Sequence, residues 1–175
     1  FETIIASGPN GAKAHHHPSE RKLEMGDGVV IDLGALYDGY CSDITRTVLM
    51  GPATDRQREV YEHLLKAQVA CIDAMKPGAN GKDVDGLARS ILDEKDLGQY
   101  FGHGLGHGLG ALVHDTGRLS PIVDQAIEAG QIWTIEPGVY IEGFGGMRIE
   151  DDILVTEGAP EVLTTFPKQL IEVSC

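Results

Sequence analysis

The sequence predicts an α+β domain built on a curved, antiparallel sheet with helices on its flank. Two apolar, β-branched segments separated by a turn signal lie near the N-terminus, and two more lie near the C-terminus. Between them, residues 53–95 carry apolar side chains at helical spacing. Strands, then helices, then strands again are typical of α+β proteins.

The N-terminal part reads as strands joined by turns. Residues 1–7 are predicted to form a strand, and residues 8–19 form a loop because they are rich in Gly, Pro, Asn and Ser. Residues 28–37 are β-branched and apolar, which predicts a buried strand. The dipeptide Asp38-Gly39 is a hairpin signal, so residues 40–50 are the returning strand.

Two helices follow. Residues 53–78 have an apolar face at the helical period, a capping residue at Thr54 and a stop at Pro77-Gly78. Residues 83–95 repeat this apolar spacing. We therefore expect two amphipathic helices that cover one side of the sheet.

The remaining chain reads as strand again. Residues 131–142 and 147–156 are predicted strands joined by a glycine-rich turn, and residues 161–166 form a further short strand. This second hairpin completes the predicted antiparallel sheet.

Composition narrows the class of protein. The chain has 175 residues, which suits one domain with a hydrophobic core. Its formal net charge of -13 argues against a nucleic-acid partner, which needs clustered Lys and Arg. No apolar run approaches the roughly 20 residues needed to span a bilayer, so no membrane partner is expected. Three widely spaced cysteines, Cys41, Cys71 and Cys175, fit a reducing cytoplasm.

Four carboxylates interrupt the predicted strands. Asp32 and Asp43 lie in the first hairpin, and Glu136 and Glu150 lie in the second. A buried carboxylate without a partner is very costly, so each needs a cation, an arginine or several donors. Acids at matching depth on one face of paired strands can converge on a shared site.

A histidine-rich segment can complete that site. Residues 101–117 contain His103, His107 and His114 among six glycines. Carboxylates with one imidazole suit divalent ions such as Mn²⁺, Co²⁺ and Zn²⁺. Four acids and a histidine are too many for one catalytic ion and suit two ions that share carboxylates. The residues alone leave open which histidine binds.

The ordered motifs resemble those of the metal-dependent Xaa-Pro peptidases, prolidase and aminopeptidase P, which are relatives of methionine aminopeptidase with the pita-bread (creatinase/aminopeptidase-like) fold. Five segments in the family's order carry the resemblance: SGPNGAKAHHHPS, VVIDLGALYDGYCSDITRT, FGHGLGHGLGALVHD, IWTIEPGVYI and GGMRIEDDILVT. The resemblance implies that residues 1–175 are a metallopeptidase catalytic domain without the helices and separate N-terminal domain that precede it in the family.

The resemblance also implies roles for individual residues. Five match the family's metal ligands: Asp32, Asp43, His107, Glu136 and Glu150. Asp43 and Glu150 match the bridging pair, Asp32 serves one ion, and His107 and Glu136 serve the other. Thr45 matches a residue that orients a ligand carboxylate.

Further residues match the family's catalytic and substrate-binding positions. Glu136 matches the proton shuttle, and His114 matches the histidine that hydrogen-bonds the scissile carbonyl. His103, which is also expected to act in catalysis, and His15 match histidines that line the substrate pocket, and Arg148 matches an arginine beside the substrate or the acids.

The implied activity is hydrolysis of Xaa-Pro bonds in proline-containing peptides with two divalent ions, Mn²⁺ being preferred over Co²⁺, Zn²⁺ and Fe²⁺. Xaa-Pro dipeptidase (prolidase) is the favoured reading, and aminopeptidase P, acting on longer peptides, is the alternative. A non-peptidase binding module on the same fold is a second alternative, disfavoured by the complete ligand set. A cytoplasmic location and a homodimer are expected for the full-length protein.

Overall fold

The computed structural model of the protein describes residues 1–174, so Cys175 lies outside the described residues. A four-stranded sheet has the order β1-β2-β5-β13. Its strands are β1 (Ile4–Ser7), β2 (Gly28–Leu33), β5 (Ile44–Met50) and β13 (Ile171–Val173). The first three are antiparallel neighbours, as predicted, whereas β13 runs parallel to β5. The predicted antiparallel pairing is confirmed for β1, β2 and β5, and β13, which was not predicted, adds a parallel strand at the edge.

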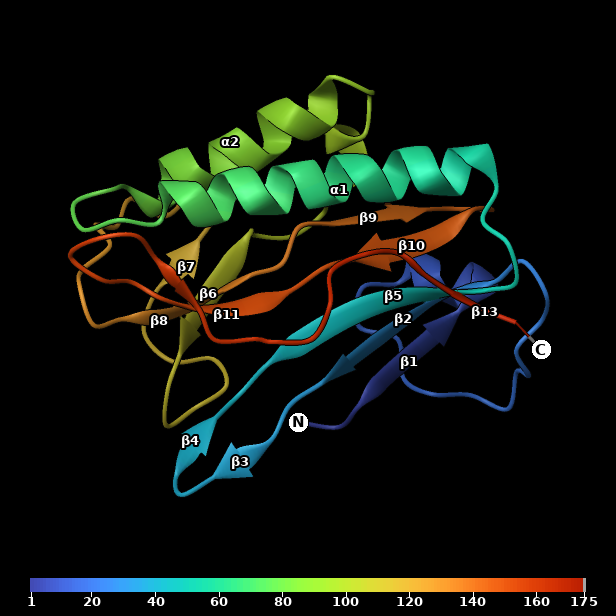
Figure 1. Ribbon diagram of the computed structural model, residues 1–175, viewed down its shortest axis with the longest axis horizontal. Coiled ribbons are helices and arrows are strands. Elements are labelled where there is room, and N and C mark those ends of the chain that lie inside the picture. The colour runs from blue at the N-terminus through green and yellow to red at the C-terminus, as the bar shows by residue number, and fades with distance from the viewer. Residues whose placement is uncertain (175) are drawn as a thin grey trace.

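The predicted first hairpin divides into two parts. Beyond β2 the chain forms a separate ribbon of β3 (Leu36–Tyr37) and β4 (Tyr40–Cys41), which projects away from the body of the sheet (Figure 1). Asp38 and Gly39 have φ values of 49° and 85°, which confirms the predicted turn. The predicted strands 28–37 and 40–50 are thus each interrupted, and Asp43 lies in the second interruption.

A five-stranded sheet has the order β12-β11-β8-β6-β7. Its strands are β12 (Glu161–Val162), β11 (Asp151–Leu154), β8 (Ile132–Ile135), β6 (Gly106–Leu109) and β7 (Arg118–Leu119). A separate ribbon pairs β9 (Gly138–Ile141) with β10 (Gly145–Arg148). The strand predicted over residues 161–166 is limited to β12, and β6 and β7 were not predicted.

The second predicted hairpin is also interrupted in both strands. Residues 131–142 divide into β8 and β9 at Glu136-Pro137, where proline has no N–H to continue a ladder. Residues 147–156 divide opposite this point, at Ile149-Glu150, into β10 and β11. The chain therefore passes from one sheet to the other at the two glutamates.

Two helices cover one side of the sheets (Figure 1). Helix α1 spans Asp55–Ala74 and begins with a capping box in which Thr54 and Gln57 exchange hydrogen bonds, as expected of Thr54. Helix α2 spans Gly81–Asp93, two residues earlier than predicted because the Asn80 side chain accepts from the N–H of Lys82. Short 3₁₀ helices η1 (Gly8–Ala12) and η2 (Gly98–Tyr100) lie in the connections.

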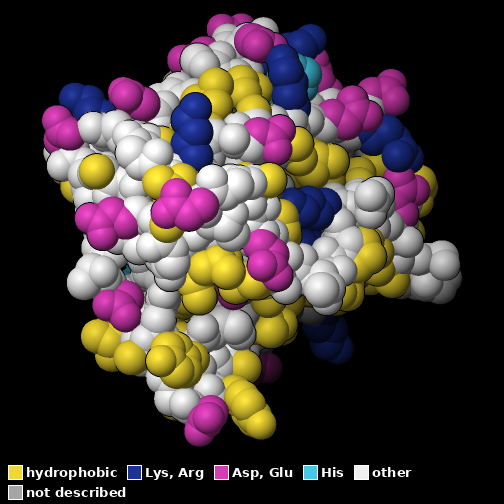
Figure 2. All heavy atoms as spheres, turned by 60° about the vertical axis from the view of Figure 1, so that its left-hand side comes forward, with side chains coloured by type: hydrophobic (Ala, Val, Ile, Leu, Met, Phe, Trp, Pro, Cys, Tyr) yellow, Lys and Arg dark blue, Asp and Glu magenta, His cyan; other side chains and the backbone are white. Residues whose placement is uncertain are grey.

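The core fills the space between these helices and the sheets. Fully buried side chains from α1, β8 and β10, including Leu64, Trp133 and Met147, belong to one apolar cluster. Among residues 1–174, no helix has both the length and the hydropathy that a membrane span requires. Figure 2 shows acidic side chains scattered over one face among basic and apolar ones, so the acidic excess is not gathered in one patch there.

Candidate metal centre

The five predicted ligands come from separate parts of the fold. Asp32 lies near the end of β2, and His107 lies in β6. Asp43 precedes β5, Glu136 follows β8, and Glu150 lies between β10 and β11. All five line one pocket of about 410 Å³. Asp43, Glu136 and Glu150 lie where strands are interrupted. At these points the side chains need not alternate between the two faces of a sheet, as they do within a strand.

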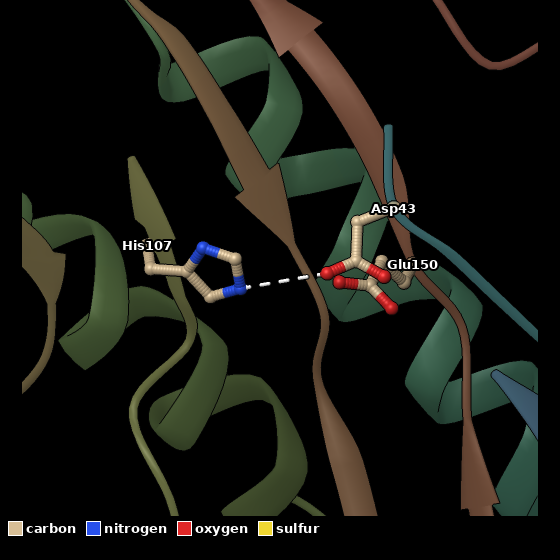
Figure 3. Close-up of side chains that lie close together, drawn as sticks. All are labelled: Asp43, His107 and Glu150. Atoms are coloured by element: carbon tan, nitrogen blue, oxygen red, sulfur yellow. Dashed lines mark ion pairs between the residues drawn. The ribbon is translucent and has the colours of Figure 1, made fainter. Parts of the chain in front are cut away.

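The centre of the group is a compact triad. Ligand atoms of Asp43, His107 and Glu150 all lie within 4.8 Å of one another. Figure 3 shows the three side chains pointing toward one another, with the imidazole facing the two carboxylates. The Nε2 atom of His107 lies 3.7 Å from Asp43 Oδ2 and 3.5 Å from Glu136 Oε1. These spacings leave room for an ion between the side chains.

The local contacts of His107 fix its tautomer. Its Nδ1 lies 3.1 Å from the carbonyl oxygen of Gly108. Because a carbonyl only accepts, Nδ1 carries the proton, and Nε2 presents its lone pair to the acids. Burial lowers the pKa of His107 to about 4, so the imidazole is neutral at physiological pH. A neutral imidazole with one nitrogen held by a carbonyl is the form that binds metals.

The carboxylates are buried and repel one another. Burial, followed by repulsion from Asp32 and Glu136, raises the pKa of Asp43 to about 8. Burial likewise raises the pKa of Glu136 to about 7, and that of Glu150 well above its usual range. In the absence of a cation, these groups therefore hold protons near neutral pH.

The nearby arginine leaves some oxygens of the four candidate carboxylates without a partner. Arg148 forms a buried ion pair with Asp32 and also lies close enough to Glu136 and Glu150 for their charges to raise its pKa. The Oδ1 atoms of Asp32 and Asp43 are buried, and neither has a hydrogen-bond partner. Unpartnered, inward-facing carboxylate oxygens beside a neutral imidazole fit a divalent cation, so the residues present fit the implied metal centre.

Neighbouring side chains orient the carboxylates. Thr45 donates to Glu150 Oε2 at 2.5 Å and accepts from Nε of Arg148 at 3.0 Å. Thr134 Oγ1 lies 3.3 Å from Glu136 Oε1 and accepts from the backbone N–H of His107 at 3.0 Å. Thr45 thus contacts a carboxylate as the resemblance implied, whereas Thr134 was missed because its contacts depend on the pairing of β6 with β8.

His103 belongs to a hydrogen-bond chain at the wall of the pocket. Its Nδ1 donates to the Gly104 carbonyl at 2.8 Å, so Nε2 accepts from the Tyr140 hydroxyl, also at 2.8 Å. The same Tyr140 oxygen accepts from Nη1 of Arg148 at 2.8 Å. Burial lowers the pKa of His103 to about 4, which keeps the ring neutral. Tyr140 was not singled out in the sequence, where it reads as an ordinary strand residue.

The pocket brings the remaining predicted residues together. His15, His103, His114 and Arg148 all line it. The ring of His114 stands edge-on to that of His107, with their centroids 4.2 Å apart. The pocket therefore combines the five candidate ligands with side chains that can hold a substrate.

Arg118 also lines this pocket and was missed in the sequence. It pairs with His107 across the β6–β7 ladder, which places a cation beside the site. Nη1 of Arg118 donates to the adjacent Gly117 carbonyl at 2.9 Å. A single arginine four residues after His114 matches no sequence motif. Its position beside His107 follows only from the pairing of β7 with β6, and neither strand was predicted.

The comparisons with known proteins agree with this geometry. The family model for metallopeptidase family M24 matches residues 1–157. The Xaa-Pro dipeptidase of Pyrococcus furiosus is 47% identical over 171 residues, which are 98% of this chain and 49% of that protein.

Solved structures give the same result. An Xaa-Pro dipeptidase from Bacillus anthracis superposes with a TM-score of 0.96 at 46% identity, covering 99% of this chain and 49% of that one. An X-Pro aminopeptidase from Thermotoga maritima gives 0.95 at 42% identity, covering 99% and 49%. The chain spans about half the length of these relatives. It has the pita-bread fold that the resemblance implied, and it belongs to metallopeptidase family M24.

Proposed function

We propose that this chain carries the catalytic site of a metal-dependent hydrolase of Xaa-Pro peptide bonds, with an Xaa-Pro dipeptidase (prolidase) as the favoured form. The convergence of five metal-ligating side chains at one pocket of about 410 Å³ is the observation that carries the proposal. The names of the relatives support the bond specificity, since they include both Xaa-Pro dipeptidases and an X-Pro aminopeptidase.

Two divalent ions would be held by the five candidate ligands. In line with the resemblance, Asp43 and Glu150 would be shared by the two ions, Asp32 would serve one of them, and His107 and Glu136 would serve the other; the close approach of Asp43, His107 and Glu150 supports this set. When bound, the ions would supply Lewis acidity and lower the pKa of water. We take Mn²⁺ as the first ion to test, before Co²⁺, Zn²⁺ and Fe²⁺.

Glu136 is suited to proton transfer. Its carboxylate lines the pocket, and its Oε1 lies 3.5 Å from Nε2 of His107, so it would be within reach of a water bound at the proposed metal centre. In the proposed reaction it accepts a proton from the attacking water and passes it to the departing proline nitrogen. Its hydrogen bond from Thr134 holds Oε1 on the side that faces the pocket.

His114 and His103 are neutral donors and acceptors on the pocket wall. Burial lowers the pKa of both rings, so each keeps one N–H and one lone pair. The N–H of His103 already donates to the Gly104 carbonyl. We therefore take His114 as the histidine that donates to the substrate carbonyl. His15 lines the same pocket and would contact the peptide.

Arg118 favours the dipeptidase over the aminopeptidase. In an Xaa-Pro dipeptide the proline that follows the scissile bond carries the free C-terminal carboxylate. The guanidinium of Arg118 lies at the pocket wall and can pair with such a group. A longer peptide has an amide at that position and gains no ion pair. Arg118 is therefore the proposed partner of the proline carboxylate.

The decisive experiment compares Ala-Pro with Ala-Pro-Ala as substrates of the intact protein, with Mn²⁺ and with chelator. Metal-dependent cleavage of Ala-Pro alone supports the dipeptidase, and loss of that activity in Arg118→Leu with partial retention in Arg118→Lys supports the carboxylate contact. Cleavage of the tripeptide moves the assignment to the aminopeptidase. No cleavage with two bound ions per chain would favour a binding module.

A further inference from the structure

Asp43 lies at a point of the chain where no strand partner holds its backbone. It follows β4 and precedes β5, so its N–H lies outside both ladders. This N–H donates to Oδ2 of Asp152 at 3.0 Å, across 109 residues of sequence. The acceptor that fixes this candidate ligand is therefore a side chain from β11.

Asp152 is itself held firmly. Its N–H donates to Thr164 Oγ1 at 2.9 Å, and its carbonyl accepts from the N–H of Leu163 at 2.9 Å. Its residue exposure is only 6%. The carboxylate thus extends from a backbone that is anchored on both sides and meets the Asp43 N–H at a fixed position.

The same two chain segments carry the central carboxylates of the site. The N–H of Glu150 donates to the carbonyl of Thr45 at 3.1 Å, and the hydroxyl of Thr45 donates to Glu150. With the Asp152 contact, three hydrogen bonds join residues 43–45 to residues 150–152. Of the three, the Asp152 contact is the one that acts directly on the backbone of Asp43.

Asp152 does not line the 410 Å³ pocket formed by the described residues. It lines a second cavity of about 380 Å³ on the other side of Asp43, together with Thr164 and Phe166. A residue in that position cannot touch a substrate in the first pocket. The Asp152 side chain reaches the site through its hydrogen bond from the Asp43 N–H.

We propose that Asp152 is a positioning residue for the metal centre, whose carboxylate oxygen holds the Asp43 backbone at the distance from Glu150 that two shared ions require. The inference rests on the metal centre of the proposed function. What matters is an acceptor oxygen at this point rather than a negative charge. An asparagine can supply that oxygen, and an alanine cannot.

The test measures Mn²⁺ affinity by calorimetry on the metal-free, intact protein for wild type, Asp152→Ala and Asp152→Asn. Loss of a group that orients a ligand typically costs 10- to 100-fold in metal affinity, and we expect about that loss for Asp152→Ala. Asp152→Asn keeps an acceptor for the N–H and is expected to stay within about threefold of wild type.

A second readout does not require metal. Amide hydrogen exchange at Asp43 is expected to speed up in Asp152→Ala and to stay near the wild-type rate in Asp152→Asn. Thr164→Val is the matched control, because it removes one hydrogen bond to the Asp152 backbone, while the bond from the Leu163 N–H, the pairing of β11 with β8 and the contact with Asp43 remain. This control is expected to lower the melting temperature without weakening Mn²⁺ binding.

Several outcomes would overturn the proposal. Asp152→Ala could bind Mn²⁺ as tightly as wild type, Asp152→Asn could lose as much affinity as Asp152→Ala, or Thr164→Val could lose it equally. Wild-type protein that binds no Mn²⁺, Co²⁺ or Zn²⁺ would instead remove the proposed metal centre itself, and with it this role of Asp152. Wild-type binding thus separates failure of the site from failure of the inference.

Discussion

Binding of Mn²⁺ to the metal-free protein is expected to release protons into solution. The carboxyls of Asp43 and Glu136 have pKa values raised to about 8 and about 7, chiefly by burial, and the pKa of Glu150 is raised well above its usual range. Below these values the groups are protonated, and an ion can bind only the deprotonated forms. Each ligand that binds must therefore give up its proton.

The size of the effect follows from these pKa values. At pH 6.5 Asp43 and Glu136 together hold about 1.7 protons, so roughly two protons per chain should be released from these two groups. His107 contributes none because its pKa is about 4. At pH 8.5 these two carboxyls together hold only about 0.3 protons, so the release should drop by about 1.4 protons per chain.

Calorimetric titration with Mn²⁺ in buffers of different ionisation enthalpy measures this number directly, since the observed heat varies with the buffer in proportion to the protons released. The same protein at pH 8.5 is the control. A release below about one proton at pH 6.5, or a release that does not change with pH, would show that the acids are already ionised and would refute the reasoning.

Three further predictions concern the stability of the protein. The raised pKa values of Asp43 and Glu136 mean that these two groups hold more protons in the folded, metal-free state than in the unfolded state between about pH 4 and pH 8, so their contribution to the free energy of unfolding should fall as pH rises, by about 1.4 kcal/mol per pH unit for each protonated group. The lowered pKa values of His103 and His107 oppose this trend only below about pH 6.5, so urea unfolding with chelator at pH 6.5 and pH 8 checks the sign, and a rise would contradict it. Gly106→Ala would place a Cβ 1.9 Å from the Thr134 carbonyl oxygen, and we expect a loss of about 3 kcal/mol, visible by thermal unfolding as a large fall in melting temperature. Thr54→Ala removes the cap of α1 and should cost about 1 kcal/mol in urea unfolding, with an unchanged midpoint as the contrary result.

Local chemistry explains what could be predicted from the sequence. The capping box at Thr54 and the turn at Asp38-Gly39 depend on neighbouring residues, and both are present as expected. The four candidate carboxylates could be recognised because each is an acidic residue within an otherwise apolar predicted strand. The structure brings all four to one pocket. Their roles in binding metal remain the proposal made above.

Non-local pairing explains what was missed. Gly106 and Gly108 lie in β6, where glycine is normally disfavoured, because added Cβ atoms would lie 1.9 Å and 2.1 Å from backbone oxygens of neighbouring segments. The sequence of this segment alone does not predict that another backbone segment packs so closely against it. Strand β13 likewise depends on a parallel partner, β5, far away in the sequence. Arg118 was missed for the same reason.

The interrupted strands determine when the site can form during folding. Asp32 comes from one sheet, His107 from another, and Glu136 and Glu150 from the two crossings between the five-stranded sheet and its ribbon. No local segment holds even the central triad, so the site forms only after distant parts of the chain have paired. Bound ions would then act mainly on the finished structure, and they should slow unfolding far more than they speed folding.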